Sequence, residues 1–432
     1  MTTRWLSLAL AAILALPLPA QAAAEELKSR MSGYFPAYVK DLETLTNIDS
    51  GTGNQEGSRR IAAFLRDRLT ALGGTVSFRE NDRGTHVIAR FKGTGKLKLL
   101  LMAHTDTVFA PGEAAKRPFR MDARRRAFGP GVGDDKATVV QTLYAMQLLK
   151  DLDFKDYAEI VLYYDAEEET GSAMGEAIIK QLARASHVVF VLDTARPGWG
   201  VLAQRKGMAT YEISVTGRSG HAGNAPHHSA SAIMELAHQI SGLYRLASPL
   251  PEDPARMTHE ALAARGIQSR GQFIPENTIN VGVIESSNRK TNVIPADARA
   301  RLEVRAFSQD ELVRLDTAIR ELAAKPTVPG TTVTLEGGIV GAPMEKTPAV
   351  SRLIATYGEV VKRTYGAEIV EWRAGGLTDG NVSAPVAPTI DGLGVENYDE
   401  HTDREWVDLN TAEPRTVALV EFIRELARTW HP

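Results

Sequence analysis

The chain has 432 residues, of which 43% are hydrophobic and 24% are charged, as is typical of a globular protein with room for two or three domains. Its 50 basic and 53 acidic residues give a formal net charge of −3, which excludes the basic field that holds a nucleic-acid backbone. The absence of cysteine excludes disulfides and thiolate-bound metals, and it leaves histidine and carboxylate ligands, which suit zinc, manganese or cobalt.

The N-terminus has the layout of a secretory signal peptide. Arg4 precedes an apolar run at 6–16, and the small residues Ala20-Gln21-Ala22 follow. The run is shorter than the ~20 residues that cross a bilayer. We therefore expect residues 1–22 to be removed near Ala22 to Ala24, and the mature protein to be periplasmic or secreted without a membrane span.

Two helices, predicted over about 28–45 and 56–72, precede an alternation of short apolar strands and amphipathic helices. The strands are expected at 97–102, 159–164 and 188–192, and the helices at 137–149 and 173–183. Alternation of this kind predicts an α/β fold with a mostly parallel sheet covered by helices.

The pattern changes after Gly198 to a strand, a helix, two strands and a helix, which predicts an inserted α+β domain with an antiparallel sheet. These elements are expected at 208–215, 229–246, 278–284, 298–305 and 309–324. Helical and buried-strand patterns resume from 349. The predicted division is a signal peptide at 1–22, a catalytic domain at 23–204 and 326–432, and the inserted domain at 205–325.

Polar clusters follow the predicted parallel strands or open the next helix. They are His104-Thr105-Asp106, the loop from Gly129 to Lys136 with Asp134 and Asp135, Glu167-Glu168-Glu169, and Asp193. Each cluster alone fits a structural role, such as a helix cap, a solvated turn or a packed histidine. Because the carboxyl ends of neighbouring parallel strands meet at one edge, the clusters converge on one crevice, where so many carboxylates need cations.

With His401-Thr402-Asp403, these motifs resemble the dizinc aminoacylase and glutamate carboxypeptidase family over essentially the whole mature chain. The resemblance implies a zinc exopeptidase-like catalytic domain, an inserted dimerisation or lid domain, and two zinc ions per subunit, with cobalt or manganese as substitutes. The implied ligands are His104 and Asp193 for one ion, Glu169 and His401 for the other, and Asp134 rather than Asp135 shared between them.

The resemblance also implies three catalytic residues. Glu168 would be the general base, Asp106 would fix the tautomer of His104, and His221 would donate to the oxyanion, reaching the partner's site in dimeric relatives. The alternative for His221 is an ordinary loop histidine.

The substrate contacts implied by the resemblance lie in the second half of the chain. Arg305 would grip a carboxylate, Asn280 would add a polar contact, and Gly375 and Gly376 would permit positive φ and a close backbone approach. The alternative for the two glycines is a simple turn.

The expected activity is hydrolysis of an amide bond beside a free carboxylate, with a glutamate carboxypeptidase foremost and a homodimer implied. An N-acyl-amino-acid deacylase or desuccinylase and a dipeptidase remain alternatives, as does a non-catalytic periplasmic binding protein. Glu168 argues against the last, because a pure binder needs no third carboxylate beside the ligands. Two departures from the family, Glu167 for Asp and the segment 341–344 without a basic residue, leave the substrate open.

Overall fold

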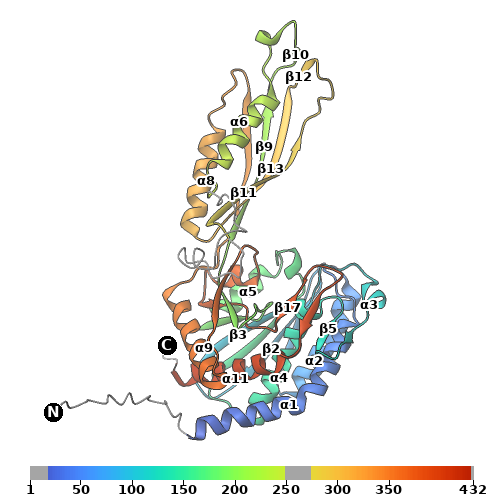
Figure 1. Cartoon of the computed structure of the whole chain (residues 1–432), viewed down its shortest axis with the longest axis vertical. Coiled ribbons are helices and arrows are strands. Elements are labelled where there is room, and N and C mark those ends of the chain that lie inside the picture. The colour runs from blue at the N-terminus through green and yellow to red at the C-terminus, as the bar shows by residue number, and fades with distance from the viewer. Residues whose placement is uncertain (1–17, 249–273, 430–432) are drawn as a thin grey trace, which may run out of the picture.

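The computed structural model describes residues 18–248 and 274–429. A helix-covered body carries an elongated sheet with two helices, which extends away from it (Figure 1). Most of the predicted signal peptide lies outside the described residues, and helix α1 (Leu18–Thr46) begins within its last positions. No helix among the described residues is long and apolar enough to cross a membrane.

The body is built on a six-stranded sheet with the order β1-β2-β6-β3-β7-β16. The strands are β1 (Thr75–Glu80), β2 (Thr85–Lys92), β3 (Lys98–His104), β6 (Glu159–Asp165), β7 (Val188–Val191) and β16 (Thr389–Ile390). Neighbouring strands from β6 to β16 run parallel, whereas β1 and β2 form an antiparallel edge. The predicted α/β class is confirmed, and the sheet is mixed because of this edge.

Both faces of this sheet are covered, which explains the uninterrupted apolar strands. Leu99 and Leu101 belong to the core on one face, and Leu100 and Met102 to the core on the other. Successive side chains of a strand point to opposite faces of the sheet, so a continuous apolar run contributes buried side chains to both faces. Helices α1, α2 (Gln55–Ala71), α4 (Ala137–Asp151), α9 (Pro348–Tyr365) and α11 (Ala412–Thr429) cover the first face, and α5 (Glu176–Arg184) and α10 (Asp379–Ser383) the second.

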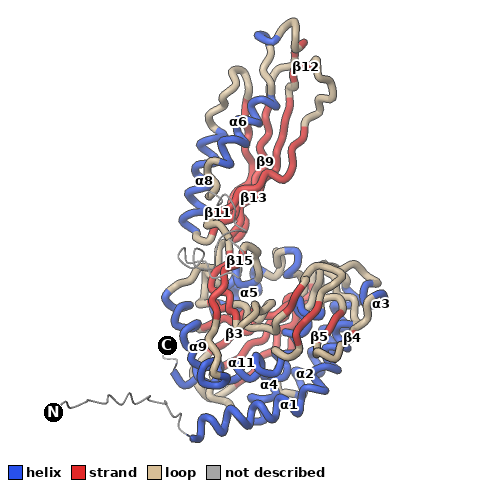
Figure 2. The backbone as a smooth tube through the Cα atoms, viewed as in Figure 1, coloured by secondary structure: helices blue, strands red, loops and turns tan. Residues whose placement is uncertain are grey.

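The inserted unit is a four-stranded antiparallel sheet with the order β11-β13-β9-β14 (Figure 2). Its elements are β9 (Gly207–Thr216), α6 (Ala232–Tyr244), β11 (Asn277–Glu285), β13 (Asp297–Ala306), α8 (Gln309–Ala323) and β14 (Thr332–Gly341). Alternate residues of β13 are buried under α6 and α8, which form a separate apolar core with the sheet. Because β14 pairs with β9, this sheet runs past the boundary predicted at residue 325.

Shorter elements complete the junction, the rim of the body and the far tip. They are α3 (Glu113–Lys116), β4 (Arg120–Met121), β5 (Arg126–Phe128), η1 (Val132–Lys136), η2 (Glu168–Thr170), β8 (Gly200–Arg205), β10 (Gly220–His221), η3 (Pro226–His228), β12 (Val293–Ile294), β15 (Val370–Ala374), β17 (Asn397–Tyr398) and β18 (Trp406–Asp408). Strand β8 pairs with β15, and β10 pairs with β12 at the end of the inserted unit farthest from the body (Figure 1).

Candidate metal centre and substrate cleft

Two histidines from distant parts of the chain meet at one carboxylate. His104 ends β3, and its Nε2 lies 2.9 Å from Oδ1 of Asp134. His401 Nε2 lies 3.1 Å from Oδ2 of the same carboxylate and 3.1 Å from Oε2 of Glu169. Asp134 is therefore placed between the two histidines, as the prediction of a shared ligand requires. Asp135 instead accepts a hydrogen bond from the backbone N–H of His104.

This donor set fits metal cations. The ligand atoms of His104, Asp134 and Glu169 lie within 4.8 Å of one another. Although burial opposes it, hydrogen bonds to Asp106 and Asp134 raise the pKa of His104, and contacts with Asp134 and Glu169 raise the pKa of His401 to about 11. The carboxylates thus draw positive charge onto both rings. Divalent cations held by imidazole and carboxylate ligands would supply that charge.

Asp193 reaches the same cavity but lies against an arginine. It follows β7, and its Oδ2 is 3.4 Å from Nη2 of Arg205, which also pairs with the buried Asp391. Burial raises the pKa of Asp193 to about 6. Asp134, Glu169, Asp193 and His401 therefore line one cavity, with Asp193 against Arg205, whereas the fifth predicted metal ligand, His104, contacts Asp134 but does not line the cavity.

Three consecutive glutamates after β6 lie in three different environments. Glu169 contacts His401, and Glu168 faces the cavity. Burial, together with the carboxylates of Asp193 and Asp379, raises the pKa of Glu168 well above its usual range. Glu167 turns away from the cavity, where its carboxylate accepts the backbone N–H of Gly175.

Asp106 connects the histidine to the glutamate loop. Its Oδ1 lies 3.3 Å from Nδ1 of His104. Its two oxygens accept the backbone N–H groups of Glu168 and Glu169, each at 3.2 Å, and Oδ2 also accepts the Thr52 hydroxyl at 2.6 Å. Asp106 therefore orients the ring of His104 and also holds the backbone of the loop that carries Glu168.

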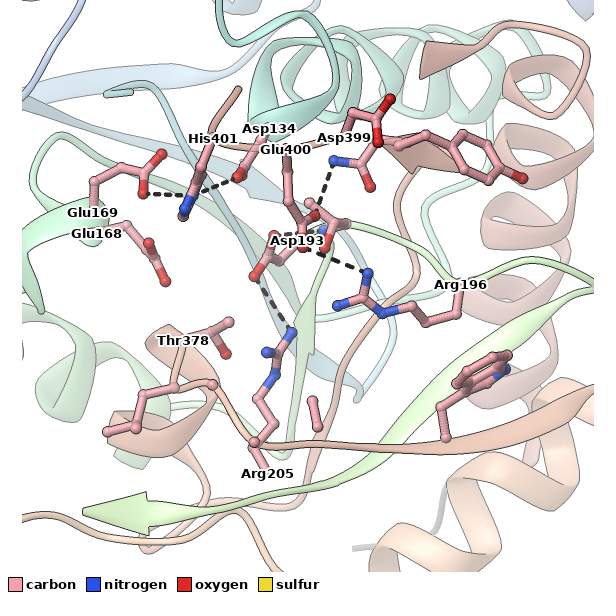
Figure 3. A pocket seen from close by; sticks show the side chains of 18 of the residues that line it. Asp134, Glu168, Glu169, Asp193, Arg196, Arg205, Thr378, Asp399, Glu400 and His401 are labelled. Atoms are coloured by element: carbon pink, nitrogen blue, oxygen red, sulfur yellow. Dashed lines mark hydrogen bonds and ion pairs between the residues drawn. The ribbon is translucent and has the colours of Figure 1, made fainter. Parts of the chain in front are cut away.

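A cavity of about 800 Å³ opens beside this centre. Figure 3 shows Asp134, Glu168, Glu169 and His401 on one side of it and Arg196 and Arg205 on the other. Arg373, Gly375 and Gly376 also line it. Metal-ligand side chains thus face three arginines across a single space, and each of these arginines is paired with a carboxylate.

For Gly375 and Gly376, which line the cavity, one of the two predicted properties is contradicted. Neither residue adopts a positive φ, so that premise is wrong. A Cβ at either position would meet no atom of the described chain within 4 Å. The two glycines therefore leave free space in the cleft.

The remaining predicted residues lie at greater distance. Arg305 does not line the large cavity, but its Nη1 donates to the carbonyl oxygen of Gly375 at 2.8 Å, and Glu303 pairs with its other nitrogens. Asn280 lines a different hollow on the inserted sheet. His221 is exposed on β10, at the tip far from the cleft of its own chain (Figure 1).

Several residues at the site were missed by sequence reasoning. Burial and the charge of Arg373 lower the pKa of Lys206, next to the cleft, to about 8. Glu405 accepts three backbone N–H groups of the loop that carries Asp134. The basic pair Arg205-Lys206 at the end of β8 was a sequence signal that could have identified Lys206. For Glu405, the sequence offered no signal other than its position four residues after His401.

Comparison with known proteins finds relatives that are peptidases or amide hydrolases. Residues 203–331 match the family model described as a peptidase dimerisation domain. The chain is 28% identical over 409 residues to carboxypeptidase G2 of Pseudomonas sp. (strain RS-16), covering 90% of this chain and 89% of the relative. It is 31% identical over 297 residues to succinyl-diaminopimelate desuccinylase of Methylorubrum extorquens (strain PA1), covering 65% of this chain and 70% of the relative.

Solved structures show the same fold. Aminopeptidase PepT of Bacillus cereus superposes with a TM-score of 0.72 at 20% identity, over 90% of this chain and 98% of that one. Sso-CP2 of Sulfolobus solfataricus, titled an M20 family metallo-carboxypeptidase, superposes with a TM-score of 0.65 at 18% identity, over 91% of this chain and 99% of that one.

Proposed function

Because the chain belongs to the M20 family of metal-dependent exopeptidases and amidohydrolases, we propose that it is an exported zinc exopeptidase that hydrolyses an amide bond beside a free carboxylate, as a glutamate carboxypeptidase does. One observation carries the proposal. Glu168 lines a cavity that has the histidine and carboxylate ligands on one wall and arginines on the other. Ligands for metal, a proton acceptor and cations for a carboxylate are what this reaction needs.

The arrangement around Asp134 supports the metal ligands that the family resemblance implies. His104 and Asp193 would hold one zinc ion and Glu169 and His401 the other, with Asp134 shared. When bound, zinc lowers the pKa of a water molecule and polarises the substrate carbonyl.

Glu168 would move the proton in this mechanism. Its partly buried carboxylate would accept the proton of the attacking water and deliver it to the leaving nitrogen of the amide. Asp106 keeps Glu168 in place by holding its backbone N–H. Arg373, which pairs with Glu276 in this structure, and Arg305 behind the Gly375 loop would attract the substrate carboxylate.

Export and dimerisation belong to the same proposal. The signal-peptide pattern that ends near Ala22 to Ala24 supports a periplasmic or secreted enzyme. The match at 203–331 supports a homodimer formed through the inserted unit. Since His221 is exposed far from its own cleft, a role in catalysis would place it at the partner's site.

A substrate panel with metal removal tests the proposal. The purified enzyme should release the C-terminal residue from N-acyl-L-glutamates, lose activity on chelation and regain it with added zinc. N-acetylornithine, N-succinyl-diaminopimelate and dipeptides form the other arms, because desuccinylases and deacetylases are among the relatives. Faster hydrolysis in one of these arms assigns the alternative activity, and activity that survives complete metal removal refutes the mechanism.

A further inference from the structure

A second hollow meets the large cavity at Glu168. It has a volume of about 350 Å³ and lies between α5, α10 and the end of β14, where the inserted unit joins the body. The two spaces share three lining residues, Glu168, Leu377 and Thr378. The proposed general base therefore stands at the junction between the two spaces.

Six of the fourteen residues that line this hollow, here called the apolar pocket, have hydrocarbon side chains. They are Ile339, Val340, Ala342, Leu377, Val382 and Pro385. Ile339 is 37% exposed and Val340 59% exposed, so two large aliphatic side chains next to Glu168 remain in contact with water. A ligand that covered them would gain the free energy of removing apolar surface from water.

A break in strand pairing explains how two consecutive residues line one pocket. On a regular strand, Ile339 and Val340 would point to opposite faces. Between Ile339, opposite Ala209, and Gly341, opposite Met208, the register of β14 against β9 shifts by one residue, which leaves Val340 as the extra residue of a bulge. Bulges redirect side chains and occur often beside active sites.

The polar groups around the apolar pocket already have partners. Lys180 pairs with Glu176, and the Ser172 hydroxyl donates to Asp379 at 2.6 Å. Asn381 donates to the carbonyl oxygen of Ala342 at 2.7 Å. An anionic ligand group in this pocket would therefore have to compete with Glu176 for Lys180.

From this geometry we infer that the apolar pocket binds the acyl side of the scissile amide, and that the enzyme prefers uncharged branched or aromatic acyl groups to small or anionic ones. The inference rests on the proposed function. The carboxylate-bearing side of the amide belongs in the cationic cavity, and the carbonyl carbon must lie beside Glu168. The acyl substituent, which is attached to this carbonyl carbon, therefore extends into the adjoining space, which is the apolar pocket.

Steady-state kinetics on an acyl series tests this specificity. The series holds N-acetyl, N-isovaleryl, N-benzoyl and N-succinyl derivatives of L-glutamate. We expect kcat/KM for the benzoyl substrate to exceed that for the acetyl substrate by at least about tenfold, since even one methylene in an apolar pocket changes kcat/KM by about 10- to 200-fold. The succinyl substrate should be the poorest of the larger acyl groups.

A double variant, Ile339→Ser with Val340→Ser, should lower the benzoyl-to-acetyl ratio by about tenfold or more. Both side chains are exposed, so the substitutions keep the fold. Val313→Ser is the matched control, because Val313 is 48% exposed on α8 and lines no part of the pocket, and it should leave the ratio unchanged.

The outcomes separate the two levels of the proposal. If the wild type hydrolyses none of the acyl-glutamates, the proposed function is wrong. If it hydrolyses them but prefers acetyl or succinyl, or if the double variant keeps the wild-type ratio, the proposed activity is retained but the apolar pocket is not the acyl site.

Discussion

The carboxylate of Glu405 accepts a hydrogen bond from the backbone N–H of Asp134 at 3.0 Å, although the two residues are 271 positions apart. The same carboxylate accepts the N–H groups of Gly131 and Gly133 at 2.8 and 2.9 Å. Burial, with the charge of Asp134 nearby, raises the pKa of Glu405 to about 7. Glu405 thus holds the backbone of the residue whose side chain lies between the two histidines.

Replacing Glu405 tests how far this support matters for metal binding. In Glu405→Gln, one acceptor oxygen becomes an N–H₂ group that faces backbone donors, so the loop shifts. We expect zinc affinity to fall by about 10- to 100-fold, the usual cost of losing a group that supports a metal ligand. Competition with a chromophoric chelator measures it. Glu413→Gln, which removes an ion pair with Arg125 in the first turn of α11, is the control. An unchanged affinity in Glu405→Gln would show that the hydrogen bonds from the loop backbone to Glu405 have no role in metal binding.

The neighbours Glu168 and Glu169 should separate chemistry from metal binding. Glu168→Gln keeps the shape but cannot accept a proton, so we expect full metal content and a fall in kcat of about 10²- to 10⁴-fold. Glu169→Gln, its matched partner, should lose metal because Glu169 contacts His401. Metal analysis and kinetics on both proteins decide the point. Retained turnover in Glu168→Gln, or metal loss equal to that of Glu169→Gln, contradicts the assignment.

Mixed dimers can show where His221 acts. His221→Ala and Glu168→Gln should each be inactive alone. If His221 serves the partner's site, a heterodimer of the two variants has one site with both residues intact, and we expect about half of the wild-type activity per dimer. Coexpression with two affinity tags isolates this heterodimer. Absence of rescue means that His221 acts within its own chain or not at all.

Lys206 should make stability depend on pH. Burial and the charge of Arg373 lower its folded-state pKa from 10.5 to about 8. Below pH 8 both states carry the proton and the folded state bears the full cost of the buried charge. Between pH 8 and 10.5 only the unfolded state keeps it, so this cost disappears as pH rises.

Lys206→Met should therefore be more stable than the wild type at pH 7, by at most about 3 kcal/mol, and the difference should shrink toward pH 10. Urea unfolding at both pH values measures this difference. The control is Lys116→Met, at an exposed lysine that pairs with Glu113. An equal difference at pH 7 and pH 10 would show that the charge of Lys206 is not the cause.

The sequence alone determined the parts of the protein that local patterns encode. Continuous apolar runs such as 99–103 specify strands buried on both faces, and a polar cluster directly after such a run lies at the sheet edge. His104, Asp134 and Glu168 were candidates because each stands in a short polar motif beside a predicted strand or helix, and the family resemblance then implied their roles. The alternation of helices and strands likewise determined the α/β class.

Only the tertiary structure decided which distant groups meet. The contact of Glu405 with Asp134, the position of Arg205 against Asp193, and the separation of Asn280 from the cleft depend on how whole elements pack. The bulge at Val340 arises from pairing between β14 and β9, and no local pattern announces it. The physical reason is that backbone periodicity is set by neighbours along the chain, whereas a long-range contact depends on the free energy of packing the entire fold.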